Sequence, residues 1–210
     1  MKSGFDGIFI AISNPVDIIA HYIYKLSGLP KNQVIGTGTA IDSARLQNMI
    51  AQTVNVDPRS VHAYSMGEHG DSQMVPWSTV TIAGKPFYDV IADNKELVGD
   101  VDLDELVYRT TQEGWEIFNR KGTTYYGIAT ACVGVIKAIL NDENRIIPVS
   151  TLLEGEYGER DVYAGVPTVL NRSGAYDVLE IHMTPGELAR FKESTRVIRE
   201  YTDRIMKLNL

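Results

Sequence analysis

The sequence has a single cysteine, Cys132, among its 210 residues. One cysteine excludes a disulfide within the chain, and no spacing of cysteines and histidines suits a zinc site. Such cysteine usage is typical of a reducing compartment, so we expect a cytoplasmic protein without a bound metal. Cys132 falls inside an apolar helical pattern, where a thiol more often packs in the core than reacts.

Long apolar runs and an excess of positive charge are missing as well. No run is long enough to cross a bilayer, and residues 1–20 lack the layout of a signal peptide. The formal net charge of -7 disfavours nucleic-acid binding, which needs a basic face. We therefore expect a globular protein that binds neither a membrane nor nucleic acid.

The sequence also lacks the G-x-G-x-x-G turn that cradles dinucleotide phosphates between a strand and a helix. Residues 8–12 nevertheless form a continuous apolar run, which predicts a parallel-sheet strand buried on both faces. One such strand needs neighbours, and few candidates follow it. We therefore expect that the chain begins partway through a domain.

The rest of the sequence mixes helical and strand patterns, which predicts an α/β or α+β fold. Helices are expected over residues 15–28, 40–54 and 101–119, from 124 to 140, and from 184 to the C-terminus, and strands at 61–64, 77–82, 146–152, 165–170 and 176–181. The later strands are expected to be antiparallel, with a hairpin turn at 171–174. Thr184, Pro185 and Glu187 predict a capping box at the start of the last helix.

One histidine lies in a turn between two glycines, in the hexapeptide Gly67-Glu68-His69-Gly70-Asp71-Ser72. Glycine permits unusual backbone angles and leaves room for a ligand. Imidazole is the side chain best suited to exchange a proton near neutral pH. The hexapeptide alone fits a catalytic histidine and a solvated surface turn about equally well.

Two other stretches have a functional and a structural interpretation, and a third has a structural one. Asn14 directly follows the first strand, where ligands bind in open α/β sheets, but it equally suits a helix cap. Asp42 and Arg45 lie one helical turn apart, either as an exposed ion pair or turned inward. An inward arginine would offer a planar fork to a carboxylate, and the aspartate would orient a histidine. Thr124, with Thr123, suits the cap of the following helix.

Four motifs occur in the order seen in L-lactate dehydrogenases: Ser13-Asn14-Pro15-Val16-Asp17, Asp42-Ser43-Ala44-Arg45, Gly67-Glu68-His69-Gly70-Asp71-Ser72 and Lys121-Gly122-Thr123-Thr124. Over essentially its whole length, the chain resembles the C-terminal two thirds of a bacterial enzyme of that family. The resemblance implies that residues 1–37 are the last part of a Rossmann-type, NAD-binding domain. Residues 38–210 would then be the mixed α+β catalytic domain. The Asn14–Pro15 bond is expected to be cis.

The resemblance also implies a role for each matching residue in the interconversion of (S)-lactate and pyruvate. His69 would be the acid/base, and Asp42 would hold its imidazole and favour the charged form. Arg45 would bind the substrate carboxylate with two hydrogen bonds, Asn14 would bond the reacting oxygen, and Thr124 would line the pocket.

The cofactor implied by the resemblance is NAD, and the implied assembly is a homotetramer. Asn14 and Ser13 would lie beside the nicotinamide, and Ile128 would pack on its ring. The motifs that hold the dinucleotide phosphates and a second catalytic arginine are expected before Met1, so the chain is interpreted as a fragment of a dehydrogenase.

Two alternatives stay open at this stage. Arg45-Leu46-Gln47 and Gly114 favour an L-2-hydroxyisocaproate dehydrogenase, whereas Glu68 disfavours a malate dehydrogenase. A different class is a non-catalytic oligomerisation or binding module left after loss of the cofactor half.

Many bacterial relatives are activated by fructose 1,6-bisphosphate, bound by an arginine and a histidine at a subunit interface. His62 matches that histidine, but Gln47 stands at the arginine position. A neutral amide cannot make a charge-assisted fork to phosphate, so we expect weak activation or none. The alternative for His62 is that it simply packs at a strand end.

Overall fold

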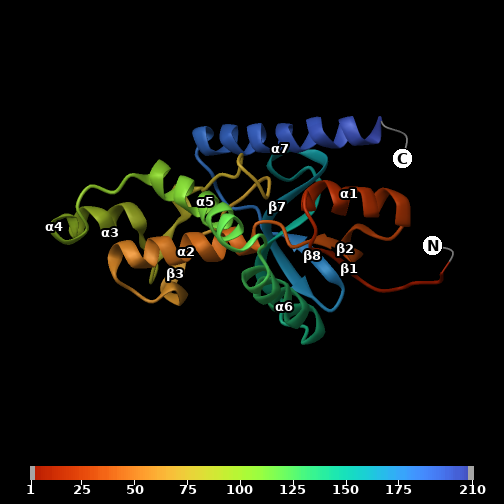
Figure 1. Cartoon of the computed structure of the whole chain (residues 1–210), viewed down its shortest axis with the longest axis horizontal. Helices are drawn as coiled ribbons and strands as arrows, with labels where there is room; N and C mark the ends of the chain where they lie inside the picture. Colours follow the sequence, from red (N-terminus) through yellow and green to blue (C-terminus); the bar gives the residue numbers. More distant parts are fainter. Residues whose placement is uncertain (1–2, 208–210) are drawn as a thin grey trace.

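The centre of the molecule is a mixed five-stranded sheet with helices on both sides (Figure 1). In the computed structural model, the described residues are 3–207. The strand order is β1 (Phe9–Ala11), β2 (Val34–Gly36), β6 (Arg145–Glu154), β7 (Arg160–Asn171) and β8 (Gly174–Val178). Only β1 and β2 are parallel, and the other neighbours are antiparallel. The predicted mixed fold class and the hairpin between β7 and β8 are confirmed.

The first strand is less buried than its apolar sequence predicts. Ile10 is only half-buried, and Ile12, just beyond β1, is 54% exposed. The prediction of burial on both faces is wrong for this chain, because β1 is the edge strand of the described sheet. Its outer edge therefore has free backbone hydrogen-bonding groups that a further strand could pair.

Strand β2 joins the parallel pair to the antiparallel strands. Gly36 at its end is paired with Ser150 of β6, so one sheet continues from residues before position 37 to residues far beyond it. The helix between the two parallel strands is α1 (Val16–Ser27), which ends at Gly28 in the left-handed conformation. The Asn14–Pro15 bond that precedes α1 is cis, as predicted.

A second group of elements packs beside the sheet around its own apolar core. Leu46, Ile50, Trp77, Phe87 and Leu106 are buried in this core. The elements are α2 (Ala40–Val54), β3 (Val61–His62), β4 (Thr81–Ile82), β5 (Lys85–Pro86), α3 (Phe87–Asp93), α4 (Lys95–Val98) and α5 (Leu103–Lys121). The core fixes α2 against α5, which lets both helices contribute residues to one pocket.

The strand predicted at residues 77–82 is wrong over its first half, since Trp77–Thr79 is a turn of 3-10 helix (η3). The hydroxyl of Thr79 and its backbone N–H both donate to the carbonyl of Pro76, and Val80 N–H donates to Trp77. These local bonds compete with strand pairing. Other turns of the same kind and length are η1 (Lys31–Gln33), η2 (Pro58–Ser60) and η4 (Glu156–Gly158).

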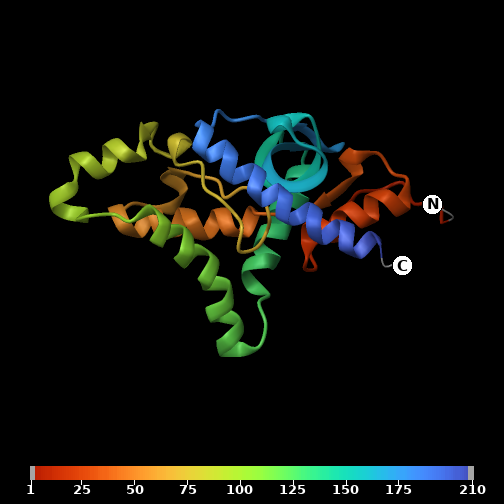
Figure 2. The ribbon, with the colours of Figure 1, turned by 90° about the horizontal axis from the view of Figure 1, so that it is seen from above.

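The last helix, α7 (Pro185–Met206), is long and runs across one side of the sheet (Figures 1 and 2). Its apolar side buries Phe191 and Ile198 in a core shared with β7. Thr184 and Glu187 form the predicted capping box at its start. Ser194 of α7 is fully buried, and its hydroxyl accepts a hydrogen bond from the histidine turn.

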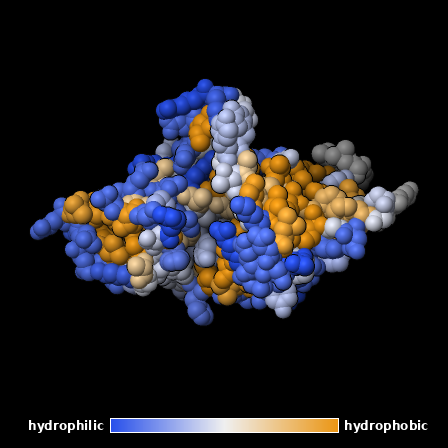
Figure 3. Space-filling view, turned by 90° about the horizontal axis from the view of Figure 1, so that it is seen from below, coloured by the Kyte–Doolittle hydropathy of each residue, from blue (hydrophilic) through white to orange (hydrophobic). Residues whose placement is uncertain are grey.

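Helix α6 (Tyr126–Leu140) lies on the opposite side, with much of its apolar surface uncovered. Val133, Ile136 and Leu140 are exposed, and Figure 3 shows hydrophobic surface gathered on this lower face. No side chain caps α6, so Thr123 and Thr124 do not have the capping role. Within residues 3–207, no helix combines the length and apolar character needed to cross a membrane.

Candidate active site

A pocket of about 480 Å³ collects six of the residues singled out from the sequence. They come from four separate segments: the turn before α1, helix α2, the histidine turn, and the start of α6 with the loop before it. The six residues are Asn14, Asp42, Arg45, His69, Thr124 and Ile128. Ser13 is exposed beside Asn14 but does not line the pocket.

Asp42, His69 and Arg45 form a connected group at the base of this pocket. His69 Nδ1 lies 2.5 Å from Asp42 Oδ2, and Arg45 Nη1 donates to Asp42 Oδ1 at 3.3 Å. The Asp42 side chain is 2% exposed and that of Arg45 is 11% exposed. The pair is therefore turned inward, and the interpretation of an exposed ion pair is wrong. Burial of Leu46 and Ile50 on the same helix holds it in this orientation.

Two glycines, Gly67 of the turn and Gly165 of β7, let the histidine turn approach the sheet and α7. Gly67 has φ +90°, and a Cβ there would lie 2.3 Å from Ser194 Oγ. Its backbone exchanges two hydrogen bonds with Gly165 of β7, at 2.9 and 2.7 Å. Ser194 Oγ accepts the N–H of Glu68 at 2.8 Å. Backbone groups of the turn thus bond to the main chain of β7 on one side and to a side-chain hydroxyl of α7 on the other.

The rest of the turn is fixed by side chains. The Glu68 carboxylate accepts from the N–H and the hydroxyl of Ser72, at 3.2 and 2.5 Å. Gln73 donates to the Gly70 carbonyl and to Thr111 Oγ1, both at 3.1 Å, and its Oε1 accepts from Ser65 at 2.5 Å. His69 therefore sits on a rigid loop, which restricts where its free Nε2 can point.

Asp17, to which the sequence interpretation gave no role, lies under the same turn. Its side chain is buried, and Oδ2 accepts the backbone N–H of His69 at 2.9 Å. Among the described residues Oδ1 has no hydrogen-bond partner, although the Ser150 hydroxyl is near enough to the carboxyl to lower its pKa. Burial dominates and raises the pKa of Asp17 to about 6. The position of Asp17, one turn after Asn14, could have marked it as part of the site. Nothing in the sequence indicates that Ser194 contacts the histidine turn.

The pKa of His69 is raised in this setting. Burial alone lowers the pKa of an imidazole, but the hydrogen bond to Asp42 and the charges of Asp42 and Asp17 outweigh it. Arg45 opposes them with a smaller effect. The environment thus favours an imidazolium that can donate a proton from Nε2 into the pocket.

The remaining pocket residues are more open. Asn14 and Thr124 are exposed, Ile128 is half-buried, and Ile12 extends the apolar wall beside Asn14. Asn14 does not cap α1, because Pro15 occupies the cap position and no side chain bonds there. Its amide is therefore available to a ligand at the end of strand β1.

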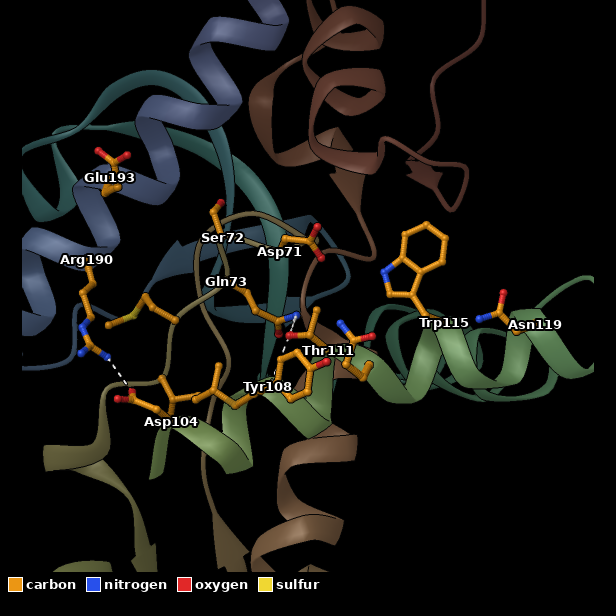
Figure 4. A pocket seen from close by; sticks show the side chains of 14 residues that line it. Asp71, Ser72, Gln73, Asp104, Tyr108, Thr111, Trp115, Asn119, Arg190 and Glu193 are labelled. Atoms are coloured by element: carbon orange, nitrogen blue, oxygen red, sulfur yellow. Dashed lines mark hydrogen bonds and ion pairs between the residues drawn. The ribbon is translucent and has the colours of Figure 1, made fainter. Parts of the chain in front are cut away.

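A larger groove of about 850 Å³ adjoins the pocket between the histidine turn, α5 and α7 (Figure 4). Figure 4 shows Asp71 and Gln73 of the turn opposite Thr111 and Trp115 of α5. These four residues line both cavities, so the groove is a continuation of the pocket. At its far end Arg190 of α7 pairs with Asp104 of α5 at 3.4 Å, both well exposed.

His62 and Gln47 line another cavity, of about 1070 Å³, on the side of α2 and α6, which shares Ile41, Arg45 and Thr124 with the pocket. His62 is exposed on β3, so the alternative of packing at a strand end does not hold. Gln47 Nε2 donates to the carbonyl of Ala63 at 3.0 Å, which occupies part of its amide. The two residues share a surface, as the effector hypothesis requires.

This fold and this site define a mixed α/β domain with a candidate active site at one end of its sheet. A sequence profile described as the lactate/malate dehydrogenase, alpha/beta C-terminal domain matches residues 39–208. The chain belongs to this family.

Known relatives agree with that assignment. L-lactate dehydrogenase 3 of Bacillus cereus is 53% identical over 201 residues, which are 96% of this chain and 64% of the relative. L-lactate dehydrogenase 1 of Bifidobacterium longum is 47% identical over 206 residues, 98% of this chain and 65% of the relative. The solved minor L-lactate dehydrogenase of Enterococcus mundtii superposes with a TM-score of 0.92 at 42% identity, covering 98% of this chain and 65% of that one. The chain thus spans a little under two thirds of the length of these relatives.

Proposed function

We propose that this chain is the catalytic part of an NAD-dependent L-2-hydroxy acid oxidoreductase of the L-lactate dehydrogenase type. The observation that carries the proposal is the convergence of His69, Asp42, Arg45 and Asn14 on one pocket. Reduction of a 2-keto acid needs a proton donor and an acid that orients it. It also needs a guanidinium that binds the substrate carboxylate and an amide that bonds the keto oxygen. The relatives named L-lactate dehydrogenase, at about half identity, support (S)-lactate and pyruvate as the substrate pair.

The protein's own part in the reaction is to bind, orient and exchange one proton. Arg45 holds the substrate carboxylate through its planar guanidinium, while Asp42 keeps that guanidinium and the imidazole in place. His69 Nε2 donates a proton to the keto oxygen in reduction and removes it from the hydroxyl in oxidation. Asn14 donates a hydrogen bond to the same oxygen, and Thr124 bounds the space around the substrate.

The residues at the mouth of the pocket fit the nicotinamide end of NAD. Ile12 and Ile128 contribute apolar surface to the pocket that the polar Asn14 also lines, which suits a flat ring with a carboxamide. The chemistry that NAD supplies is hydride transfer. We include Ser13 in this set for its place next to Asn14, although it does not line the pocket.

The test is His69→Gln in the protein at its natural length, with Tyr64→Phe on the same segment as a matched control. We expect the glutamine variant to lose ~10²-fold or more in kcat, the typical size of general acid–base catalysis. The control should keep its activity, because Tyr64 packs against the apolar core and does not line this pocket. A His69→Gln enzyme with unchanged kcat would refute the proposed role.

A broader 2-hydroxy acid specificity, of the hydroxyisocaproate type, is favoured by one observation. The pocket continues past Gly114 and Trp115 into the groove of Figure 4, which leaves space for a longer side chain. Relative kcat/KM for pyruvate and 2-ketoisocaproate separates the two specificities. The non-catalytic module stays as the other class of function, and a complete absence of turnover in the natural-length protein would favour it.

We further propose that residues 1–37 belong to the NAD-binding domain and 38–210 to the catalytic domain, in agreement with the profile boundary at residue 39. The uncovered apolar surface of α6 supports a homo-oligomer, for which we propose a tetramer. The same proposal places the protein in the cytoplasm, in fermentative use of glycolytic pyruvate. Size measurement of the natural-length protein tests the assembly.

A further inference from the structure

We propose that Asp17 is a positioning residue for His69, which holds the backbone of the histidine turn and stabilises the protonated imidazole with a second buried carboxylate. The inference rests on the proposed role of His69. It goes beyond that role, because it assigns a function to a residue that touches neither substrate nor cofactor in the mechanism above.

The first argument is geometric. Asp17 is 3% exposed, and its Oδ2 accepts the N–H of His69 at 2.9 Å. Asp17 lies in the first turn of α1, three residues after Asn14, which lines the same pocket as His69. A single contact therefore ties the histidine turn to the segment that carries Asn14. The two groups proposed to meet the reacting oxygen are thus held in one arrangement.

The second argument is that a carboxylate is a costly way to make this contact. An asparagine amide oxygen would accept the same N–H without bringing a charge into the interior. The pKa of Asp17 is raised to about 6 by burial, so the charged form is disfavoured there. The N-terminal turn of α1 offsets part of this cost, since an acid is favourable at a helix N-terminus. A destabilising charge held against the backbone of His69 indicates a function for the charge.

The charges around His69 show what this function is. Asp42 and Arg45 face the imidazole from α2, and Arg45 offsets only part of the effect of Asp42 on the pKa of His69. Glu68 and Asp71 belong to the same turn as His69; Glu68 is engaged by Ser72, and Asp71 is exposed. Asp17, from α1, adds a further buried negative charge whose field reaches the ring. Its field favours the imidazolium and so the proton that the reduction consumes.

The experiment measures the titration of His69 by NMR in the natural-length protein, with its ring signals assigned by their loss in His69→Gln. Asp17→Asn keeps an oxygen acceptor and removes the charge, whereas Asp17→Ala removes both. Asp161→Asn is the matched control, because Asp161 is an exposed acid paired with Lys25 away from the pocket. We expect the pKa of His69 to fall by roughly one unit in Asp17→Asn, the size of a nearby-charge effect, and to stay constant in the control.

Thermal melting of the same variants separates this role from a purely structural one. An acid with a raised folded pKa stabilises the fold below its unfolded pKa of 3.8, and this contribution is lost as the pH rises through about 6. We therefore expect Asp17→Asn to melt at the same or a higher temperature than the native protein at pH 8, despite its lower His69 pKa. Asp17→Ala should melt lower, since the His69 N–H is left unpaired.

An unchanged pKa of His69 in Asp17→Asn overturns the inference, and so does a lower melting temperature of that variant at pH 8, which would make Asp17 a structural cap. Neither result touches the proposed function, which His69→Gln tests separately by turnover. Conversely, an active His69→Gln enzyme would refute the catalytic role while the titration of His69 still reported on Asp17.

Discussion

Gly114 of α5 lies directly against the guanidinium of Arg45 on α2. A Cβ at position 114 would stand 3.1 Å from Nη1 and 3.4 Å from Nη2 of Arg45. This spacing is tighter than ordinary van der Waals contact, so a methyl group would have to displace the guanidinium by a few tenths of an ångström. The absence of a side chain at Gly114 thus sets both the room in the pocket and the position of Arg45, the arginine that we propose binds the substrate carboxylate.

Gly114→Ala is expected to raise KM for every 2-keto acid, because Arg45 moves, and to penalise longer substrates more. Loss of space for one methyl or methylene group is worth about 1–3 kcal/mol, so kcat/KM for 2-ketoisocaproate should fall about tenfold or more relative to pyruvate. Gly186→Ala on α7 is the control, since a Cβ there meets no atom within 4 Å. An unchanged ratio of the two kcat/KM values would count against a specificity role for Gly114.

Stability should depend on pH through His69. Its pKa is raised above the ordinary 6.5, so the stabilisation from this group is complete below pH 6.5 and is lost as the pH rises through the folded pKa. Urea unfolding of native protein and His69→Gln across this range should show the largest gap in free energy of unfolding on the acidic side. A gap that grows with rising pH would mean that His69 is held as a neutral imidazole.

The 210-residue chain by itself should bind NAD weakly and turn over little or no substrate. We propose that its pocket holds the nicotinamide end of the cofactor, but its sequence contains no glycine-rich loop to hold the phosphates. Isothermal titration of the purified chain measures this directly. Micromolar binding of NAD would contradict the prediction and point to a phosphate site elsewhere on the surface.

The chain should associate through the uncovered face of α6. Leu140 is 69% exposed next to other exposed apolar side chains, and removal of that surface from water favours contact between copies. Leu140→Lys is expected to shift sedimentation toward smaller species. Leu97→Lys, at a residue that is 76% exposed on the distant helix α4, should leave the distribution as it is. Equal behaviour of the two variants would exclude α6 as the contact.

Fructose 1,6-bisphosphate should activate the natural-length enzyme weakly or not at all. Gln47 carries no charge, and its amide is engaged with the carbonyl of Ala63. Gln47→Arg is expected to create a response, since it adds a cation beside His62 in the cavity they share. Asn48→Arg, which lines the same cavity, is the control for added charge alone. Strong activation of the unmodified enzyme at micromolar effector would show that other residues build the site.

Much of the architecture could be predicted from local patterns. Short stretches of sequence specify the 40–54 helix, the β7–β8 hairpin and the capping box at Thr184. Periodicity, turn residues and caps act within a few positions along the chain. The wrong predictions concern residues whose structure depends on competing local hydrogen bonds or on which elements cover them. Thr79 bonds its own neighbours in place of a strand partner, and residues 8–12 are less buried than their apolar character indicates.

The candidate site likewise has features that follow from the local sequence and features that depend on tertiary packing. The sequence by itself determined that His69 lies in a glycine turn and that Asp42 and Arg45 share a helix face, because these relations follow from backbone geometry over a few residues. Only the tertiary structure decided that the pair faces inward, that Asp17 lies under the histidine, and that Ser194 fastens the turn from 126 residues away. Such contacts depend on how separate elements pack, and packing joins residues whose distance along the chain carries no signal.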